Sequence, residues 1–415
     1  MWLQHTSSRE RRTLLAGFLG YGVDGFDFMI YSFVIPTLLV IFSMSKAEAG
    51  YIASGALLTS AVGGWGAGIL ADRYGRVPVL QITVLWFAIF ACLSGFAHSP
   101  NQLLLSRCLQ GFGFGGEWSV GSVLVSETIE ARHRGKAAGL VQSSWAVGWA
   151  LAACAFWLVS LLAPPQIAWR ILFWIGVAPA LLILYVRRHV AESPIFTASR
   201  RDTLATSSVY AIFSRSLLRT TLLASLLSTG MLGAYYSVST WLPTYLKLER
   251  HLSVTGTSGY LLVLIAGSFA GYLTSAWLSD TLGRRRCFIS FAVCSALLVL
   301  IYMRLPLTDT VMLALGFPLG FFVSGIFSGM GAYLAELYPN SVRCSGQGFC
   351  YNVGRAAGAV CPAFIGSWAT RWPLGVVIGS VTAGAYALVI IAACALPETR
   401  GRELLADADL AIEHR

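Results

Sequence analysis

Charged residues inside otherwise apolar stretches are the groups of this chain best suited to do chemistry. Arg107 and Glu117 lie in the run LLLSRCLQGFGFGGEWSVGSVLVSE, residues 103–127. The run is long enough to cross a bilayer, because about 20 residues of helix span the hydrocarbon core. A charge at the centre of a membrane helix is costly, so it usually faces a partner, a cavity or a substrate. We expect one of these three for both residues.

Two acids, Asp24 and Asp27, lie in a second apolar segment. On a helix their side chains point about 60° apart, and Tyr31 returns to within about 20° of Asp24, so one polar stripe faces one direction. A carboxyl group in a low-dielectric cavity resists ionisation, so it can bind and release a proton. All six histidines lie in predicted loops or tails, which leaves Asp24, Asp27 and Glu117 as candidates for proton coupling. Alternatively, one Asp pairs permanently with an arginine and only holds helices together.

Arg107 and Arg355 are the arginines inside apolar segments, and we expect them to contact an anionic substrate. A guanidinium group offers a planar fork of donors that suits a carboxylate. The alternative for Arg107 is that it neutralises Glu117 or an Asp of the first helix. Polar and aromatic groups that could line the same cavity are Tyr31, Gln142, Ser143, Ser144, Trp145, Tyr235, Tyr236 and Asn352.

The composition indicates that most of these residues lie within a membrane. The chain has 415 residues, of which 56% are hydrophobic and only 12% charged, and its mean hydropathy is +0.69. A soluble domain is about 25% charged. The net charge of +10 is carried by loops, which is typical of membrane orientation rather than of nucleic-acid binding. The nine cysteines show no CxxC spacing, so we expect no metal site, disulfide or cofactor.

Hydropathy predicts an all-α membrane protein with twelve transmembrane helices. We place them at residues 14–41, 50–71, 78–97, 102–127, 137–163, 169–187, 217–247, 255–279, 287–304, 310–337, 345–370 and 374–396. A polar segment divides the chain into an N-terminal six-helix bundle (1–187), a linker (188–216) and a C-terminal six-helix bundle with a short tail (217–415). Lys and Arg gather in alternate loops and in both tails, which predicts that both termini are cytoplasmic.

The two bundles repeat one another in sequence. GILADRYGR at 68–76 is echoed by AWLSDTLGR at 276–284. Parallel repeats of this kind place a substrate site near the membrane midplane, at the interface of the halves. Helix 7 has Met231 and Ala234 at the positions of the two helix-1 acids, so we expect coupling chemistry in the first half only.

Four signatures resemble those of the major facilitator superfamily, and the likeness covers nearly all of the chain. They are Gly68-x-Leu70-Ala71-Asp72-Arg73-x-Gly75-Arg76, Arg107-x-x-Gln110-Gly111, Glu192-Ser193-Pro194 and Pro397-Glu398-Thr399. The sequence departs from the pattern at Val77, where Lys or Arg is usual, and at Ala276, where the second copy would have Gly. The resemblance implies twelve helices in two six-helix pseudo-symmetric bundles, and transport by alternating access.

Three segments narrow the resemblance to organic-acid/proton symporters. They are DGFDF at 24–28, QGFGFGGEW at 110–118 and NVGRAAG at 352–358. Together they are most similar to the sialate:proton symporter branch, which includes monocarboxylate carriers, and then to the aromatic-acid:proton symporters. The resemblance implies proton-coupled symport of a monocarboxylate, sialic acid or aromatic acid. We expect a monomer in a lipid bilayer, the bacterial inner membrane, with no nucleic-acid partner.

Repeated charges on the cytoplasmic side resemble the salt-bridge layer that closes that side in outward-open members of the superfamily. They are Asp72, Arg73, Arg76, Glu127, Arg134, Asp280, Arg284, Glu336 and Arg343. Exposed ion pairs are individually weak, about 0–1 kcal/mol, which suits a lock that opens in every cycle. The alternative is that these charges only orient the helices, and the repeated acid positions argue against it.

Other functions compete with symport. Drug or metabolite/proton antiporters of the same superfamily tend to carry Gly and Pro in helix 5, whereas residues 137–163 contain no proline. A membrane sensor that binds a ligand without moving it would need an added signalling domain, and neither tail nor linker is long enough for one. An enzyme is not expected, because no nucleophile–base set, metal-ligand spacing or phosphate loop stands out.

Overall fold

The computed structural model describes residues 6–129, 134–177, 189–192, 212–338 and 343–400, and the statements below concern these residues. Several side chains within these ranges also lie outside the description. Among the predicted gate residues they are Asp72, Arg73, Glu127, Arg134, Asp280 and Arg343.

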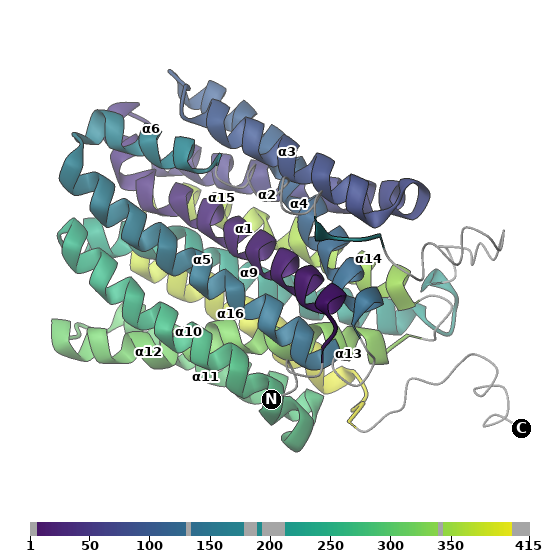
Figure 1. Ribbon diagram of the computed structural model, residues 1–415. Helices are drawn as coiled ribbons and strands as arrows, with labels where there is room; N and C mark the ends of the chain where they lie inside the picture. The colour runs from purple at the N-terminus through teal and green to yellow at the C-terminus, as the bar shows by residue number, and fades with distance from the viewer. Residues whose placement is uncertain (1–5, 130–133, 178–188, 193–211, 339–342, 401–415) are drawn as a thin grey trace, which may run out of the picture.

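Long helices make up the described chain (Figure 1). The first six are α1 (Ser8–Ile41), α2 (Lys46–Tyr74), α3 (Arg76–Ser94), α4 (Pro100–Thr128), α5 (Arg134–Leu162) and α6 (Pro165–Ile175). The others are α9 (Leu218–Leu248), α10 (Val254–Leu282), α11 (Arg284–Arg304), α12 (Asp309–Gly325), η4 (Ile326–Gly329), α13 (Met330–Glu336), α14 (Arg343–Gly358), α15 (Val360–Trp368) and α16 (Leu374–Ala395). Eight candidate membrane spans are found by length and hydropathy among the described residues. These findings confirm the predicted all-α membrane architecture, although the predicted end of the sixth helix lies outside the described residues.

Two predicted transmembrane helices contain an irregular turn. The helix predicted at 310–337 is one candidate span in the structure, Asp309–Leu334, whereas the helix predicted at 345–370 is interrupted. The first contains the 3₁₀ segment η4 between α12 and α13, at a site where Gly325 and Gly329 weaken the α-helical preference. The second breaks at Ala359 between α14 and α15. Pro362 lies three residues after that break and has no N–H to donate to the preceding turn, which favours a helix start there.

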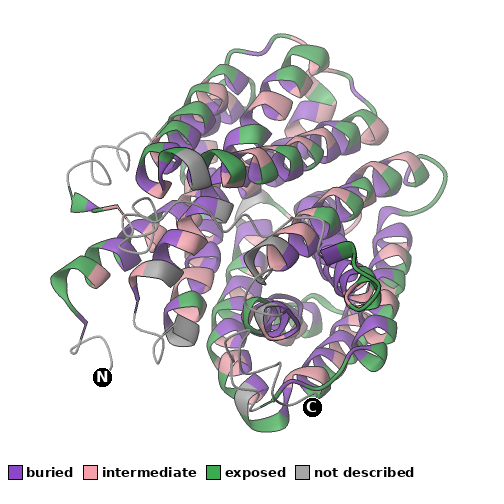
Figure 2. Ribbon diagram, turned by 90° about the vertical axis from the view of Figure 1, so that its right-hand side faces the viewer, coloured by how far each residue is buried: buried purple, intermediate pink, exposed green. Residues whose placement is uncertain are grey.

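The helices run along one common direction, and the beginning of α1 and the end of α16 lie at the same end of the bundle (Figure 1). Seen from that end, buried faces point inward and exposed apolar faces point outward (Figure 2). Equivalent helix pairs pack equally closely in both halves. A Cβ added at Gly115 would lie 1.7 Å from the Ser60 carbonyl oxygen, and one at Gly320 would lie 1.8 Å from that of Leu264. Glycine is therefore required where α4 meets α2 and where α12 meets α10.

The starts of α3 and α11 share an unusual cap. Each helix follows a glycine with positive φ, Gly75 at 108° and Gly283 at 97°. A glutamate distant in sequence then accepts hydrogen bonds from the first backbone N–H groups of the helix. The Glu192 carboxylate accepts from the amides of residues 76 and 77 at 3.0 and 3.1 Å, and Glu398 accepts from residues 284 and 285 at 2.9 and 3.1 Å. These carboxylates satisfy amides that a helix start otherwise leaves without acceptors.

Candidate functional site

A closed triad of buried polar side chains joins α1 to α4. Arg107 Nη1 donates to Asp27 Oδ2 at 2.8 Å and to Gln110 Oε1 at 2.7 Å, and Gln110 Nε2 donates to the same Asp27 oxygen at 2.7 Å. All three residues are at most 5% exposed. Arg107 and Gln110 can act together because residues three apart lie on one face of a helix. The structure therefore pairs Arg107 with an acid of the first helix.

The triad keeps unused hydrogen-bonding capacity. Asp27 Oδ1 and Arg107 Nε have no hydrogen-bond partner among the described residues. Both side chains line a small cavity, to which Tyr31, Phe114 and Thr240 also contribute. Thr240 belongs to α9, so the cavity lies at the interface between the N-terminal and C-terminal helices. Tyr31 is held in place because its hydroxyl donates to the Ala49 carbonyl at 2.8 Å, while its ring lies 5.4 Å from the Arg107 guanidinium carbon.

Asp24 and Glu117 form a second acidic group, beside the triad. Asp24 is 0% exposed and Glu117 is 3% exposed, and the two carboxyl groups interact with each other. No donor among the described residues hydrogen-bonds to any of their four oxygens. Two adjacent negative charges in a site of low dielectric constant repel strongly, so a proton on one of them stabilises the pair.

Arg355 of α14 lies across from this acidic pair in a setting of aromatic rings. Its guanidinium carbon is 5.0 Å from the ring centre of Tyr351 and 5.5 Å from that of Phe114, a residue of α4. The Tyr236 side chain also contacts the guanidinium group. Arg355 is only 2% exposed, so its charge lies in the buried interface between the two halves.

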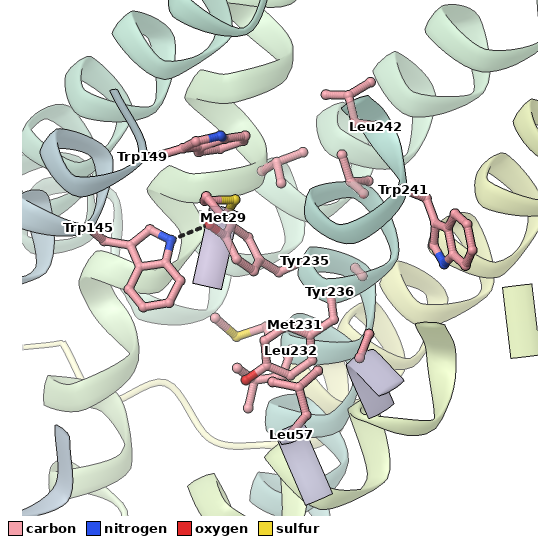
Figure 3. Close-up of a cluster of buried hydrophobic side chains, with 14 of the residues drawn as sticks. Met29, Leu57, Trp145, Trp149, Met231, Leu232, Tyr235, Tyr236, Trp241 and Leu242 are labelled. Atoms are coloured by element: carbon pink, nitrogen blue, oxygen red, sulfur yellow. Dashed lines mark hydrogen bonds between the residues drawn. The ribbon is translucent and has the colours of Figure 1, made fainter. Parts of the chain in front are cut away.

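A tryptophan–tyrosine hydrogen bond crosses the same interface (Figure 3). Trp145 Nε1 of α5 donates to the Tyr235 hydroxyl of α9. Phe28 packs beside the indole, with a ring-centre distance of 5.7 Å, and contacts the Tyr236 ring at 5.8 Å. The centre of the protein is therefore an aromatic cluster between the triad and Arg355.

Two of the other predicted lining residues have local partners. Gln142 Nε2 donates to the Tyr21 hydroxyl at 2.9 Å, beside the aromatic cluster, since Tyr21 lies 5.1 Å from Trp145. Asn352 Nδ2 donates to the Gly348 carbonyl of its own helix at 3.1 Å, which leaves its Oδ1 without a partner among the described residues. Asn352 is thus partly used to support its own helix.

Contacts between α2 and α15 close the halves at the end of the bundle away from the start of α1. Ser54 Oγ accepts a hydrogen bond from the Ala363 amide at 2.9 Å, and Lys46 Nζ donates to the Ala369 carbonyl at 3.4 Å. The helix backbones also approach closely, because a Cβ at Gly50 would lie 2.5 Å from the Pro362 carbonyl oxygen. By the predicted orientation, this is the outer face.

At the opposite end, the described gate residues make contacts within their own halves. Arg284 Nη2 lies 3.0 Å from Glu336 Oε1, and the Thr399 hydroxyl donates to Glu336 Oε2 at 2.5 Å. Arg76 Nη1 donates to the Ala71 carbonyl at 2.8 Å. The predicted layer is thus described in part, and the side chains of its other members lie outside the description.

Sequence reasoning missed the contributions of four residues. Gln110 stands in a quoted signature, and its spacing of three from Arg107 could have indicated a shared hydrogen-bond network. Phe28 and Phe114 carry no signal of their own in an apolar helix, because their role depends on which helix faces them. Glu398 was quoted as part of a signature, but only the fold shows that its carboxylate caps α11.

Comparisons with known proteins identify the family and the fold. The profile of the Major Facilitator Superfamily matches residues 17–310 and 261–408. The chain belongs to this superfamily. A solved structure of another member, the proton:xylose symporter XylE bound to 6-bromo-6-deoxy-D-glucose, has a TM-score of 0.75 at 18% sequence identity and covers 96% of this chain and 98% of that chain. The predicted major facilitator fold is thereby confirmed.

Relatives within the superfamily are named for organic acids and related compounds. A probable 4-methylmuconolactone transporter of Cupriavidus pinatubonensis is 41% identical over 400 residues, 96% of this chain and 93% of that protein. The cis,cis-muconate transport protein of Acinetobacter baylyi is 30% identical and covers 89% of this chain and 90% of its own. The sialic acid transporter NanX of Escherichia coli is 25% identical, with 94% and 95% coverage. This major facilitator protein is a transporter, and the expectation that it is not an enzyme is confirmed.

Proposed function

We propose that this major facilitator transporter carries a small unsaturated carboxylate together with a proton. Its relatives support an organic-acid cargo, and the 41% identity to a probable 4-methylmuconolactone transporter favours a compact acid over a large polyhydroxylated one such as sialic acid. Stacking rings also suit a flat, unsaturated molecule better than a sugar acid that carries many hydroxyl groups.

One observation supports this proposal most directly, namely the position of Arg355. This buried guanidinium belongs to the second half and contacts a ring of the first half, that of Phe114. A carboxylate that binds Arg355 gains charge-assisted hydrogen bonds and draws the two halves together. Binding energy of this kind can favour one access state over the other. Tyr236 and Tyr351, which contact the guanidinium, supply further hydroxyl groups for the anion.

The proton binds in the first half. Asp24 and Glu117 face each other without another donor among the described residues, which favours a shared proton. Asp27 holds a second acidic position, and its link to Arg107 lets protonation release the guanidinium from its ion pair. Protons enter with the anion because neutralising the acids lowers the cost of enclosing the loaded site in the low-dielectric interior.

Alternating access then requires the halves to rock about this centre. We assign the moving units to residues 1–187 and 217–415, joined by 188–216. The protein lies in a bacterial inner membrane with both termini on the cytoplasmic side. The α2–α15 contacts close the outer side, and the predicted charge layer closes the inner side when the outer side opens. The protein acts as a monomer, since one chain supplies both walls of the site.

Uptake into proteoliposomes tests the proposal. We expect 4-methylmuconolactone and cis,cis-muconate to enter faster when the external medium is acidic, and a proton-specific ionophore to abolish accumulation above the external concentration. Pyranine trapped inside should report acidification that accompanies uptake. Uptake that ignores the proton gradient would exclude symport. If instead protons that flow inward from an acidic external medium drive export of the organic acid, the antiport alternative is correct.

A further inference from the structure

We propose that Phe114 couples the substrate site to the proton site, so that anion binding at Arg355 opens the Asp27–Arg107 cavity. The inference rests on the proposed function and adds a positioning residue that carries no charge. In the proposed function, the anion and the proton bind to different helices in different halves. Coupling between the two sites therefore needs a residue that contacts both of them.

Phe114 lies between the two proton-binding groups on one face of α4. Arg107, Gln110, Phe114 and Glu117 follow one another at spacings of three, four and three residues. Such spacing places all four on the same side of a helix. The ring is therefore flanked by the triad on one side and by the acidic pair on the other.

The same ring touches both sites. It lies 5.5 Å from the Arg355 guanidinium carbon, in the geometry of a cation–π contact, and it lines the cavity beside the triad. It stacks on Phe28 at 6.3 Å and 18°, and on Phe87 at 6.4 Å and 28°. Phe114 is half-buried, while the acids and arginines around it are almost fully buried. The Phe114 ring thus separates the Arg355 guanidinium from the cavity that Asp27 lines.

A carboxylate at Arg355 changes the balance of forces on this ring. A full negative charge interacts with a guanidinium more strongly than the face of a ring does, so the anion competes with Phe114 for the same cation. The edge of the ring is then released to turn on its Phe28–Phe87 stack. This motion gives protons and water access to the unused Asp27 Oδ1. The reverse motion, after the anion leaves, isolates the acid again.

The test compares leak with coupling. The variants are Phe114→Leu, which removes the ring, and Phe114→Tyr, which keeps it. The matched control is Phe156→Leu, a buried stacking residue of α5 whose partner is Phe33 and which lies outside both sites. In proteoliposomes with trapped pyranine, the probe is 4-methylmuconolactone. We measure its uptake under an inward proton gradient, its counterflow without a gradient, and the protons taken up per molecule of acid.

We expect Phe114→Leu to keep counterflow within about threefold of wild type but to lose about tenfold in gradient-driven accumulation, with a lowered ratio of protons to acid. Phe114→Tyr and Phe156→Leu should keep the wild-type ratio. A wild-type ratio in Phe114→Leu would overturn the inference, as would equal losses of counterflow and accumulation in Phe114→Leu and Phe156→Leu. If wild-type protein itself accumulates the acid without protons, the proposed symport fails as well, which separates the two failures.

Discussion

The buried side chains of the two halves differ in chemistry, although the helices of the two halves are capped and packed in the same way. The first half buries three acids, Asp24, Asp27 and Glu117, with one arginine tied into a hydrogen-bonded triad. The second half presents Arg355 among tyrosines. At the positions that correspond to the two helix-1 acids, α9 has Met231 and Ala234, both fully buried and apolar.

The helix packing of the two halves is alike even at individual caps and helix–helix contacts. Glu192 and Glu398 cap equivalent helices, and Gly115 and Gly320 allow equivalent helices to touch. The comparison teaches that the packing of a repeated bundle is retained by geometry, while the charges inside are free to diverge. We therefore propose that proton handling and anion recognition belong to separate halves. The following variants test that assignment, from the largest expected effect to the smallest.

Removal of the second-half cation should have the largest effect. We expect Arg355→Ala to lower uptake of 4-methylmuconolactone about thirtyfold or more, because truncating one partner of a buried charged contact costs about 2–5 kcal/mol. The fold should survive, and a melting curve of the purified protein checks this. Arg355→Lys keeps the charge without the planar fork and should retain binding weakly. Normal uptake by Arg355→Ala would remove anion recognition from the second half.

Neutralising the triad should separate coupling from binding. We expect Asp27→Asn to reduce gradient-driven accumulation about tenfold or more while counterflow continues, because the variant cannot change its charge. It also leaves the Arg107 charge without its partner, which destabilises by about 3–5 kcal/mol. The double variant Asp27→Asn with Arg107→Gln should recover thermal stability without recovering accumulation. Recovery of both would show that the triad has a packing role alone.

The acidic pair should set how uptake depends on external pH. In Glu117→Gln the neighbouring Asp24 loses the repulsion of a second carboxylate, so it no longer needs a shared proton. We expect uptake by this variant to respond several-fold less to external acid between about pH 5.5 and 7.5, because repulsion between two carboxylates favours proton binding near neutral pH and the variant lacks that repulsion. Initial rates across that range supply the measurement. An unchanged pH profile would place the coupled proton on Asp27.

The shared caps should give the smallest effect and the same one in both halves. Burial alone raises the pKa of Glu398, but four backbone N–H groups, those of residues 284, 285, 399 and 400, donate to the carboxylate and together lower that pKa below its usual value. The cap therefore stabilises the fold above the unfolded pKa, and that contribution is lost as the pH falls through the lower folded pKa.

We expect Glu398→Gln and Glu192→Gln each to cost about 1 kcal/mol or less at pH 7, because these carboxylates are partly exposed. Melting curves at pH 7 and near pH 4 provide the check. For Glu398→Gln the difference from wild type should shrink toward the lower pH. A difference that grows with acid would contradict the assigned cap.

The family, the fold and most helix positions could be predicted from sequence, because apolar length, loop charge and repeated signatures are local properties. The polar stripe of Asp24, Asp27 and Tyr31 was likewise visible in the helical period. What could not be predicted is which partner each charge faces. Arg107 had an acid of α1 and Glu117 as equal candidates, and only the packing of α1 on α4 selects Asp27. The helix break at Ala359 was missed because hydropathy continues smoothly through it.

That break separates the segment that holds Arg355 from the segment that packs against α2. Arg355 lies in the last turn of α14, whereas Ala363 and Pro362 fasten α15 to α2. In the proposed transport cycle, this break allows α14 to tilt while α15 stays packed on α2. In the proposed cycle, binding of the acid at Arg355 then does not have to disrupt the α2–α15 contacts, so a weakly bound acid is enough to be transported.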